Sequence, residues 1–152
     1  MDWNDQKSIA LSRLGVALLA LLLLALDIGG YWLAGWALRI SEVLGEGLKD
    51  GLLLLASLYL CSVPAWLLIF SLWRLLKNLG LELIFTAENV SLLRRISWYC
   101  VAMGLVCLLS ALYYLPFMLP AIAAAFMALI VRIVKNCFEQ AVLMKDELDY
   151  TV

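Results

Sequence analysis

The chain has 152 residues, of which 66% are hydrophobic and 15% are charged. Soluble domains average about 45–50% apolar and about 25% charged residues, so this composition indicates one membrane-embedded domain and excludes an ordinary soluble protein. The formal net charge of -1 gives no basic footprint for direct nucleic-acid binding, and the lack of histidine removes the commonest metal ligand and general base.

The first apolar segment is a predicted membrane span over residues 12–36. Its centre is almost entirely Leu, Ala and Val. About 20 residues cross a hydrocarbon core of about 30 Å, so the segment is long enough to tilt or to bend at Gly29-Gly30. Ala25-Leu26-Asp27 is a poor signal-peptide cleavage site and the apolar character continues beyond it, so we expect an uncleaved helix.

A polar, glycine-containing loop, Arg39–Gly51, leads to the second predicted span, residues 52–73. Pro64 lies inside this span and predicts a kink rather than a break, because neighbouring helices can satisfy the freed carbonyl. Apolar residues then continue at spacings of three and four, which predicts that the helix projects into water; they are Ile69, Leu72, Leu76, Leu79 and Leu83.

The loop of residues 74–95 is the main polar interruption between the apolar segments. Thr86 is predicted to cap the next helix, with Glu88 near the positive end of the helix dipole. Residues 96–115 and 121–134 are the third and fourth predicted spans, and the short connection between them implies an antiparallel pair. Small residues spaced by four predict close packing of these two helices: Cys100, Gly104, Cys107 and Ala111 on one, and Ala121, Ala124, Ala125 and Ala128 on the other.

The last segment, residues 135–152, is predicted to be a charged helical tail in water. It continues an apolar stripe of helical spacing, which consists of Ile130, Val134, Cys137, Ala141, Met144 and Leu148. Two interpretations of the stripes on the second and fourth helices stay open. They bury each other or lie on the membrane surface, or they form a docking stalk for a cytoplasmic partner.

The distribution of lysine and arginine predicts that both termini lie in the cytoplasm, because basic residues are enriched at the cytoplasmic ends of membrane helices. In this orientation only Arg39 and Lys49 lie on the outer side. The other basic residues lie inside: Lys7, Arg13, Arg74, Lys77, Arg94, Arg95, Arg132, Lys135 and Lys145.

Asp27 is the one acidic residue inside a predicted span, which makes it a candidate intramembrane polar site. It lies roughly 21 Å along the helix from Arg13, nearer the outer face, where it meets either water or the hydroxyl of Tyr113 or Tyr114. A purely structural role is the other interpretation, since a proton relay needs further titratable groups nearby. The four cysteines form no C-x-x-C pair, so we expect them to pack between helices. No catalytic, cofactor-binding or metal site is predicted, and we expect no enzymatic activity.

Two segments, IFTAENVSLLRRIS and the ending RIVKNCFEQAVLMKDELDYTV, resemble the YoaS-like family of small four-span bacterial membrane proteins, a domain of unknown function. The resemblance covers about Leu52–Val152. The family tail commonly ends in an Asn-Asp-Leu-Thr-Ile/Val pattern, from which Leu148 and Tyr150 depart. Genes of this family often lie beside one for a helix-turn-helix regulator. The resemblance therefore implies a membrane partner that holds or tunes a cytoplasmic regulator.

Together these features predict an all-α integral protein of the bacterial inner membrane. Four transmembrane helices form a four-helix bundle, and helices 2 and 4 extend into the cytoplasm. The leading hypothesis is a non-enzymatic interaction or regulatory protein, whose partner is a soluble protein or a second copy of the chain. Its candidate partner-binding residues are Phe85, Thr86, Glu88, Asn89, Arg94, Arg95, Phe138, Glu139, Lys145 and Glu147. The alternative is a small transporter, channel or export subunit that uses Asp27.

Overall fold

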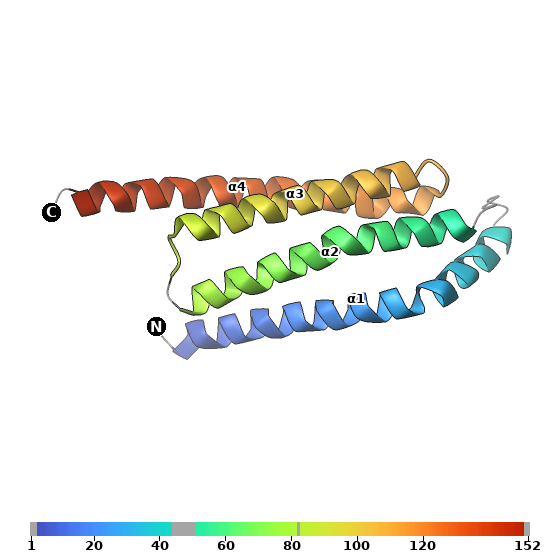
Figure 1. Cartoon of the computed structure of the whole chain (residues 1–152), viewed down its shortest axis with the longest axis horizontal. Coiled ribbons are helices and arrows are strands. Elements are labelled where there is room, and N and C mark those ends of the chain that lie inside the picture. Colours follow the sequence, from blue (N-terminus) through green and yellow to red (C-terminus); the bar gives the residue numbers. More distant parts are fainter. Residues whose placement is uncertain (1–2, 44–50, 82, 151–152) are drawn as a thin grey trace.

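The structure, a computed structural model, describes residues 3–43, 51–81 and 83–150. Its elements, in chain order, are α1 (Trp3–Val43), α2 (Gly51–Gly80), α3 (Ala87–Ser110), the short 3-10 helix η1 (Leu115–Phe117) and α4 (Met118–Tyr150) (Figure 1). Each of the four α-helices contains a stretch that is long and apolar enough to cross a membrane. The prediction of an all-helical chain with four long apolar helices, each a candidate membrane span, is confirmed. Lys49, placed in the outer loop by the sequence, lies outside the described residues.

Large apolar side chains point outward along all four helices. Leu22 of α1, Leu60 of α2, Leu109 of α3 and Ile122 of α4 are each about 60% exposed. Each helix satisfies its own backbone hydrogen bonds, so such outward-facing apolar surface suits hydrocarbon and not water. The arrangement is that of a protein with lipid as its solvent.

Several helix boundaries differ from the predicted spans. α2 continues unbroken through Pro64 to Gly80, which confirms both the absence of a break and the projection beyond residue 73. α3 ends at Ser110, five residues before the predicted end at residue 115, because a turn at 111–113 and η1 follow it. α4 begins at Met118 rather than at residue 121, since Pro120 falls in its first turn, where a missing N–H costs no helical hydrogen bond.

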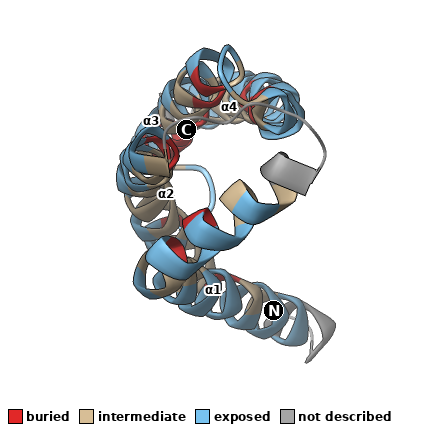
Figure 2. Ribbon diagram, turned by 90° about the vertical axis from the view of Figure 1, so that its right-hand side faces the viewer, coloured by how far each residue is buried: buried red, intermediate tan, exposed pale blue. Residues whose placement is uncertain are grey.

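The helices do not close into the bundle that the sequence predicted. α1 packs on α2, α2 on α3 and α3 on α4, and no other pair of α-helices is in backbone contact within the described residues. Seen from the end, the helices follow one another along an arc (Figure 2). The prediction was wrong here because apolar side chains suit a neighbouring helix and lipid equally well.

The predicted small-residue packing of α3 on α4 is confirmed. A Cβ added at Gly104 would lie 3.4 Å from Cβ of Ala124, so the glycine permits the close approach of the two backbones. Two turns from Gly104 along α3, the hydroxyl of Ser97 donates to the carbonyl of Ala128 at 3.2 Å. Cys107, predicted to face α4, instead has its Sγ 3.6 Å from Sγ of Cys61 on α2.

A buried apolar cluster lies at one end of the helices, where α2, α3 and α4 meet. Leu75, Leu92, Leu93, Ile96, Cys100 and Ala128 are buried there. Leu72 and Leu79, from the predicted α2 stripe, pack against this cluster. The predicted α4 stripe is different, because Val134, Met144 and Leu148 are exposed. The two stripes therefore do not bury each other.

Candidate functional site

The first candidate site is the end of the molecule where the α2–α3 loop meets α4. We call it the head region: the described loop residues 81 and 83–86, residues 87–95 of α3, and residues 135–148 of α4. All ten candidate partner-binding residues lie in it. Figure 1 shows α4 extending past the loop on this side, so the tail projects beyond the rest of the molecule.

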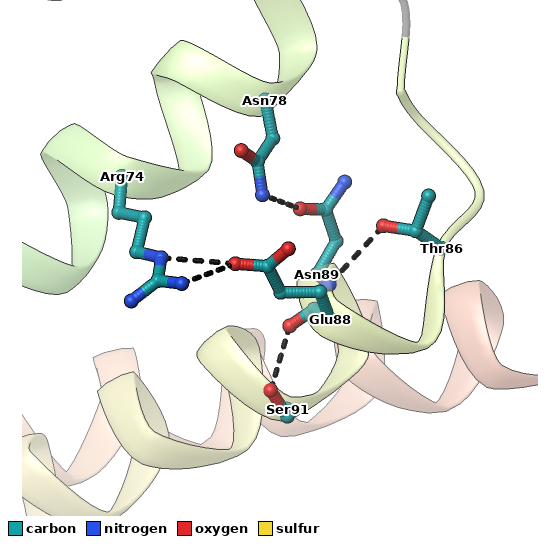
Figure 3. Close-up of polar contacts among 6 residues, drawn as sticks. All are labelled: Arg74, Asn78, Thr86, Glu88, Asn89 and Ser91. Atoms are coloured by element: carbon teal, nitrogen blue, oxygen red, sulfur yellow. Dashed lines mark hydrogen bonds and ion pairs between the residues drawn. The ribbon is translucent and has the colours of Figure 1, made fainter.

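Asn89 fixes the loop. Its side chain is fully buried, and Nδ2 donates to the carbonyls of Leu83 at 2.6 Å and Ile84 at 2.8 Å. Its Oδ1 accepts from Nδ2 of Asn78 on α2 at 2.9 Å (Figure 3). A single side chain thus joins α2, the loop and α3, and its burial is stabilised because its polar atoms are hydrogen-bonded.

The start of α3 is built as the sequence predicted. Oγ1 of Thr86 accepts from the backbone N–H of Asn89 at 3.4 Å, so Thr86 is the N-cap of α3. Glu88 lies in the first turn and pairs with Arg74 of α2, with 2.8 Å between Nη2 and Oε1 (Figure 3). Both side chains are about half exposed or more, so this ion pair orients the loop and adds little stability.

Two contacts join the tail to the rest of the head region. The rings of Phe85 and Phe138 lie 5.8 Å apart between centroids. Glu139 accepts from Nζ of Lys135 at 2.6 Å and lies 3.5 Å from Nη2 of Arg94 on α3. The hydrogen bond from Lys135, with the charges of Lys135 and Arg94, lowers the pKa of Glu139 below its ordinary 4.5.

The candidate residues thus divide into two groups. Seven contact other parts of the chain: Phe85, Thr86, Glu88, Asn89, Arg94, Phe138 and Glu139. The side chains of Arg95, Lys145 and Glu147 are exposed, and Glu147 also interacts with another residue of the chain. The first group shapes the head region, and only its outer surface is open to another molecule.

That outer surface also carries many large apolar side chains. The loop exposes Leu81, Leu83, Ile84 and Phe85, at 60%, 50%, 39% and 46%. The tail exposes Leu143, Met144 and Leu148, at 59%, 58% and 68%. Both segments therefore expose apolar side chains of the kind that form surfaces for protein or membrane contact.

The second candidate site surrounds Asp27, at the middle of the α1–α2 interface. Its Oδ2 accepts from Nε1 of Trp66 at 2.8 Å and from the hydroxyl of Ser62 at 3.2 Å. The Tyr59 hydroxyl donates to the backbone carbonyl of Asp27 at 3.0 Å. The sequence predicted Tyr113 or Tyr114 as a possible partner of the Asp27 carboxyl group. This prediction is wrong, because Oδ2 accepts from Ser62 and Trp66, and the Tyr113 hydroxyl donates to the carbonyl of Leu53.

The other carboxyl oxygen of Asp27 is unusual. Oδ1 is buried and has no hydrogen-bond partner among the described residues. Asp27 also lines a cavity of about 240 Å³, whose walls come from all four α-helices and include Cys61, Met103, Cys107 and Phe117. A buried carboxyl oxygen without a partner is costly, so this site favours a bound group that carries a hydrogen-bond donor or a positive charge.

Sequence reasoning missed Tyr59, Ser62 and Trp66. Each is an ordinary residue of an apolar helix, and nothing in its own neighbourhood marks it. The signal lies in the pairing of α1 with α2 as an antiparallel hairpin, in which Gly30 approaches Leu58 and Tyr59 and so places Asp27 opposite Ser62 and Trp66.

Comparison with curated proteins found no match, and comparison with solved structures found none. A family of proteins of unknown function, DUF2975, matches residues 35–152. The match includes α2, α3, η1, α4 and the whole head region. Because it spans well over half of the sequence, this chain belongs to the DUF2975 family.

Proposed function

We propose that this protein is a non-enzymatic interaction protein of the bacterial inner membrane, whose head region binds a soluble partner in the cytoplasm. The observation that carries the proposal is the apolar surface of the loop and the tail. The exposed apolar side chains include Leu83, Ile84, Met144 and Leu148. Hydrogen bonds, ion pairs and a ring contact hold other residues of the head region in place. Apolar side chains that stay exposed outside the membrane spans indicate a binding surface.

The distribution of charge supports a cytoplasmic head region. Arg94, Arg95, Arg132, Lys135 and Lys145 all belong to this end of α3 and α4. Basic residues are enriched at the cytoplasmic ends of membrane helices, so both termini and the head region lie in the cytoplasm. The partner then comes from the cytoplasm.

The partner in this proposal is a helix-turn-helix regulator, as the resemblance to YoaS-like proteins implies. The protein would hold the regulator at the membrane and keep it from its sites on DNA. The apolar surface suits a helical partner, because an amphipathic helix recognises exposed apolar groups at helical spacing. The chain itself binds no nucleic acid in this proposal.

The test is cross-linking in cells, followed by purification of the full-length tagged protein and mass spectrometry. Met144→Glu places a charge on the exposed apolar surface, and Gln140→Glu adds the same charge at an exposed polar position of α4. We expect a soluble DNA-binding protein with the wild type and Gln140→Glu but not with Met144→Glu. Recovery of only membrane proteins, or equal recovery with both variants, would overturn the proposal.

A second candidate function, transport or export, rests on Asp27. Its buried Oδ1 without a partner and the adjoining cavity favour the binding of an organic cation with an apolar body. Asp27→Asn keeps the shape and removes the charge. Loss of cation-dependent flux in vesicles, with an unchanged amount of folded protein, would support transport, and unchanged flux would exclude a role for the carboxylate.

A further inference from the structure

A groove runs between α3 and α4 on the outer surface of the molecule. It has a volume of about 440 Å³, and its floor contains the small residues Gly104, Ala121, Ala125 and Ala128. Larger apolar side chains line it, among them Leu105 and Leu129, which are 55% and 61% exposed. The groove therefore presents an almost wholly apolar channel to the surrounding lipid.

A second cavity, of about 390 Å³, continues this groove toward the head region, and both are lined by Ser97, Val101 and Arg132. Arg94, Lys135 and Trp98 complete the lining of the second cavity. Three cations thus surround one end of an apolar groove. Trp98 is 66% exposed, as is typical of tryptophan at the level of lipid headgroups.

The balance of charge at this end is positive. Glu139 pairs with Lys135 and Arg94, so one carboxylate opposes three cations. Arg132 has no ion-pair partner within the part of the chain that the structure describes. A guanidinium of this kind is suited to a phosphate group, which it can bind through two parallel hydrogen bonds.

The length of the groove matches one leaflet of a bilayer. Its lining on α3 extends from Ser97 to Leu108. Eleven helical steps correspond to roughly 16 Å, close to half of the ~30 Å hydrocarbon core. An acyl chain that starts at the cations would therefore run along the groove to about the middle of the membrane.

We propose that the α3–α4 groove is a binding site for an acidic phospholipid of the leaflet that borders the head region. One acyl chain lies over Gly104 and Ala125, and the phosphate lies among Arg94, Arg132 and Lys135. Basic pockets between membrane helices bind anionic headgroups through this combination of charge and apolar contact. The site does not depend on the soluble partner proposed above.

The bound lipid would also act on the head region. Lys135 and Arg94 both pair with Glu139. A phosphate that shares these cations competes with Glu139, and the contact between tail and α3 would respond to the lipid. The site thus connects membrane composition to the surface on which a partner would dock.

The test is native mass spectrometry of the full-length protein, released from nanodiscs that contain equal amounts of phosphatidylglycerol and phosphatidylcholine. We expect preferential retention of phosphatidylglycerol. Arg132→Gln should lower its apparent affinity about fivefold, the value expected for one cation near a membrane surface. Arg95→Gln is the matched control, since Arg95 is an exposed cation on α3, next to Arg94, but does not line the cavity.

A second pair of variants tests the apolar part. Ala125→Phe fills the groove from its exposed side, and Ala123→Phe places the same ring on an exposed position of α4 outside the groove. Only Ala125→Phe should reduce lipid retention. Equal retention of the two phospholipids, or equal effects of Arg132→Gln and Arg95→Gln, would overturn the proposal.

Discussion

Replacing Asn89 by alanine tests whether one buried side chain holds the α2–α3 loop. The wild-type side chain donates to the carbonyls of Leu83 and Ile84 and accepts from Asn78. The variant removes all three hydrogen bonds. It leaves the N-cap of α3 in place, in which Oγ1 of Thr86 accepts from the backbone N–H of residue 89. The perturbation is therefore confined to the loop and to its attachment to α2.

The expected magnitude follows from these three hydrogen bonds. Each contributes a net of about 1 kcal/mol, so Asn89→Ala should destabilise the closed loop by about 3 kcal/mol. Asn78→Ala removes only the bond between the two amides and should cost about 1 kcal/mol. Ser91→Ala removes an exposed hydroxyl that donates to the Glu88 carbonyl, and it serves as a control with little effect.

The assay is hydrogen exchange of the loop amides in the purified full-length protein. The amides of Leu81 and Leu83 both donate to the carbonyl of Asn78, so their protection reports the closed loop. About 3 kcal/mol corresponds to more than a hundredfold faster exchange in Asn89→Ala, and Asn78→Ala should give about fivefold. Unchanged protection in Asn89→Ala, or an equal loss in both variants, would refute this explanation.

Two further predictions concern α4. Because the folded-state pKa of Glu139 is below 4.5, its contacts with Lys135 contribute stability that is fully present above pH 4.5 and is lost as the pH falls through the lowered pKa. The difference in thermal unfolding midpoint between wild type and Glu139→Gln should therefore shrink below pH 4.5, and a constant difference would contradict this. Gly104→Leu should destabilise the protein by about 1–3 kcal/mol, because its side chain meets Ala124 across the α3–α4 interface. Gly15→Leu, where an added Cβ meets nothing within 4 Å, should leave the denaturant midpoint in detergent almost unchanged.

Local and periodic signals explain why much of the fold could be predicted. Hydropathy and length were sufficient for the four spans, and the Thr86 cap depends on residues within one helical turn. The contact of Gly104 with Ala124 followed from small residues at a spacing of four. Each of these features depends on residues close together in the sequence.

Other features depend on how helices are paired, which one sequence does not encode locally. Phe85 meets Phe138, 53 positions along the chain, and Asp27 meets Trp66, 39 positions along the chain. The early end of α3 at Ser110 was missed because the apolar and aromatic residues that follow still suit a membrane helix. Only the three-dimensional register shows which polar atoms of the candidate sites have partners.

The serial contacts of the helices have a consequence for how the protein is made. Within the described part of the chain, every backbone contact between two α-helices joins helices that follow each other in the sequence, from α1 on α2 to α3 on α4. Each hairpin can therefore assemble as soon as its second helix has been synthesised, without waiting for a distant segment. Among the residues that the structure describes, α1 has backbone contact with α2 alone, so it is the helix that can detach first, while α2, α3 and α4 keep the main apolar cluster among themselves.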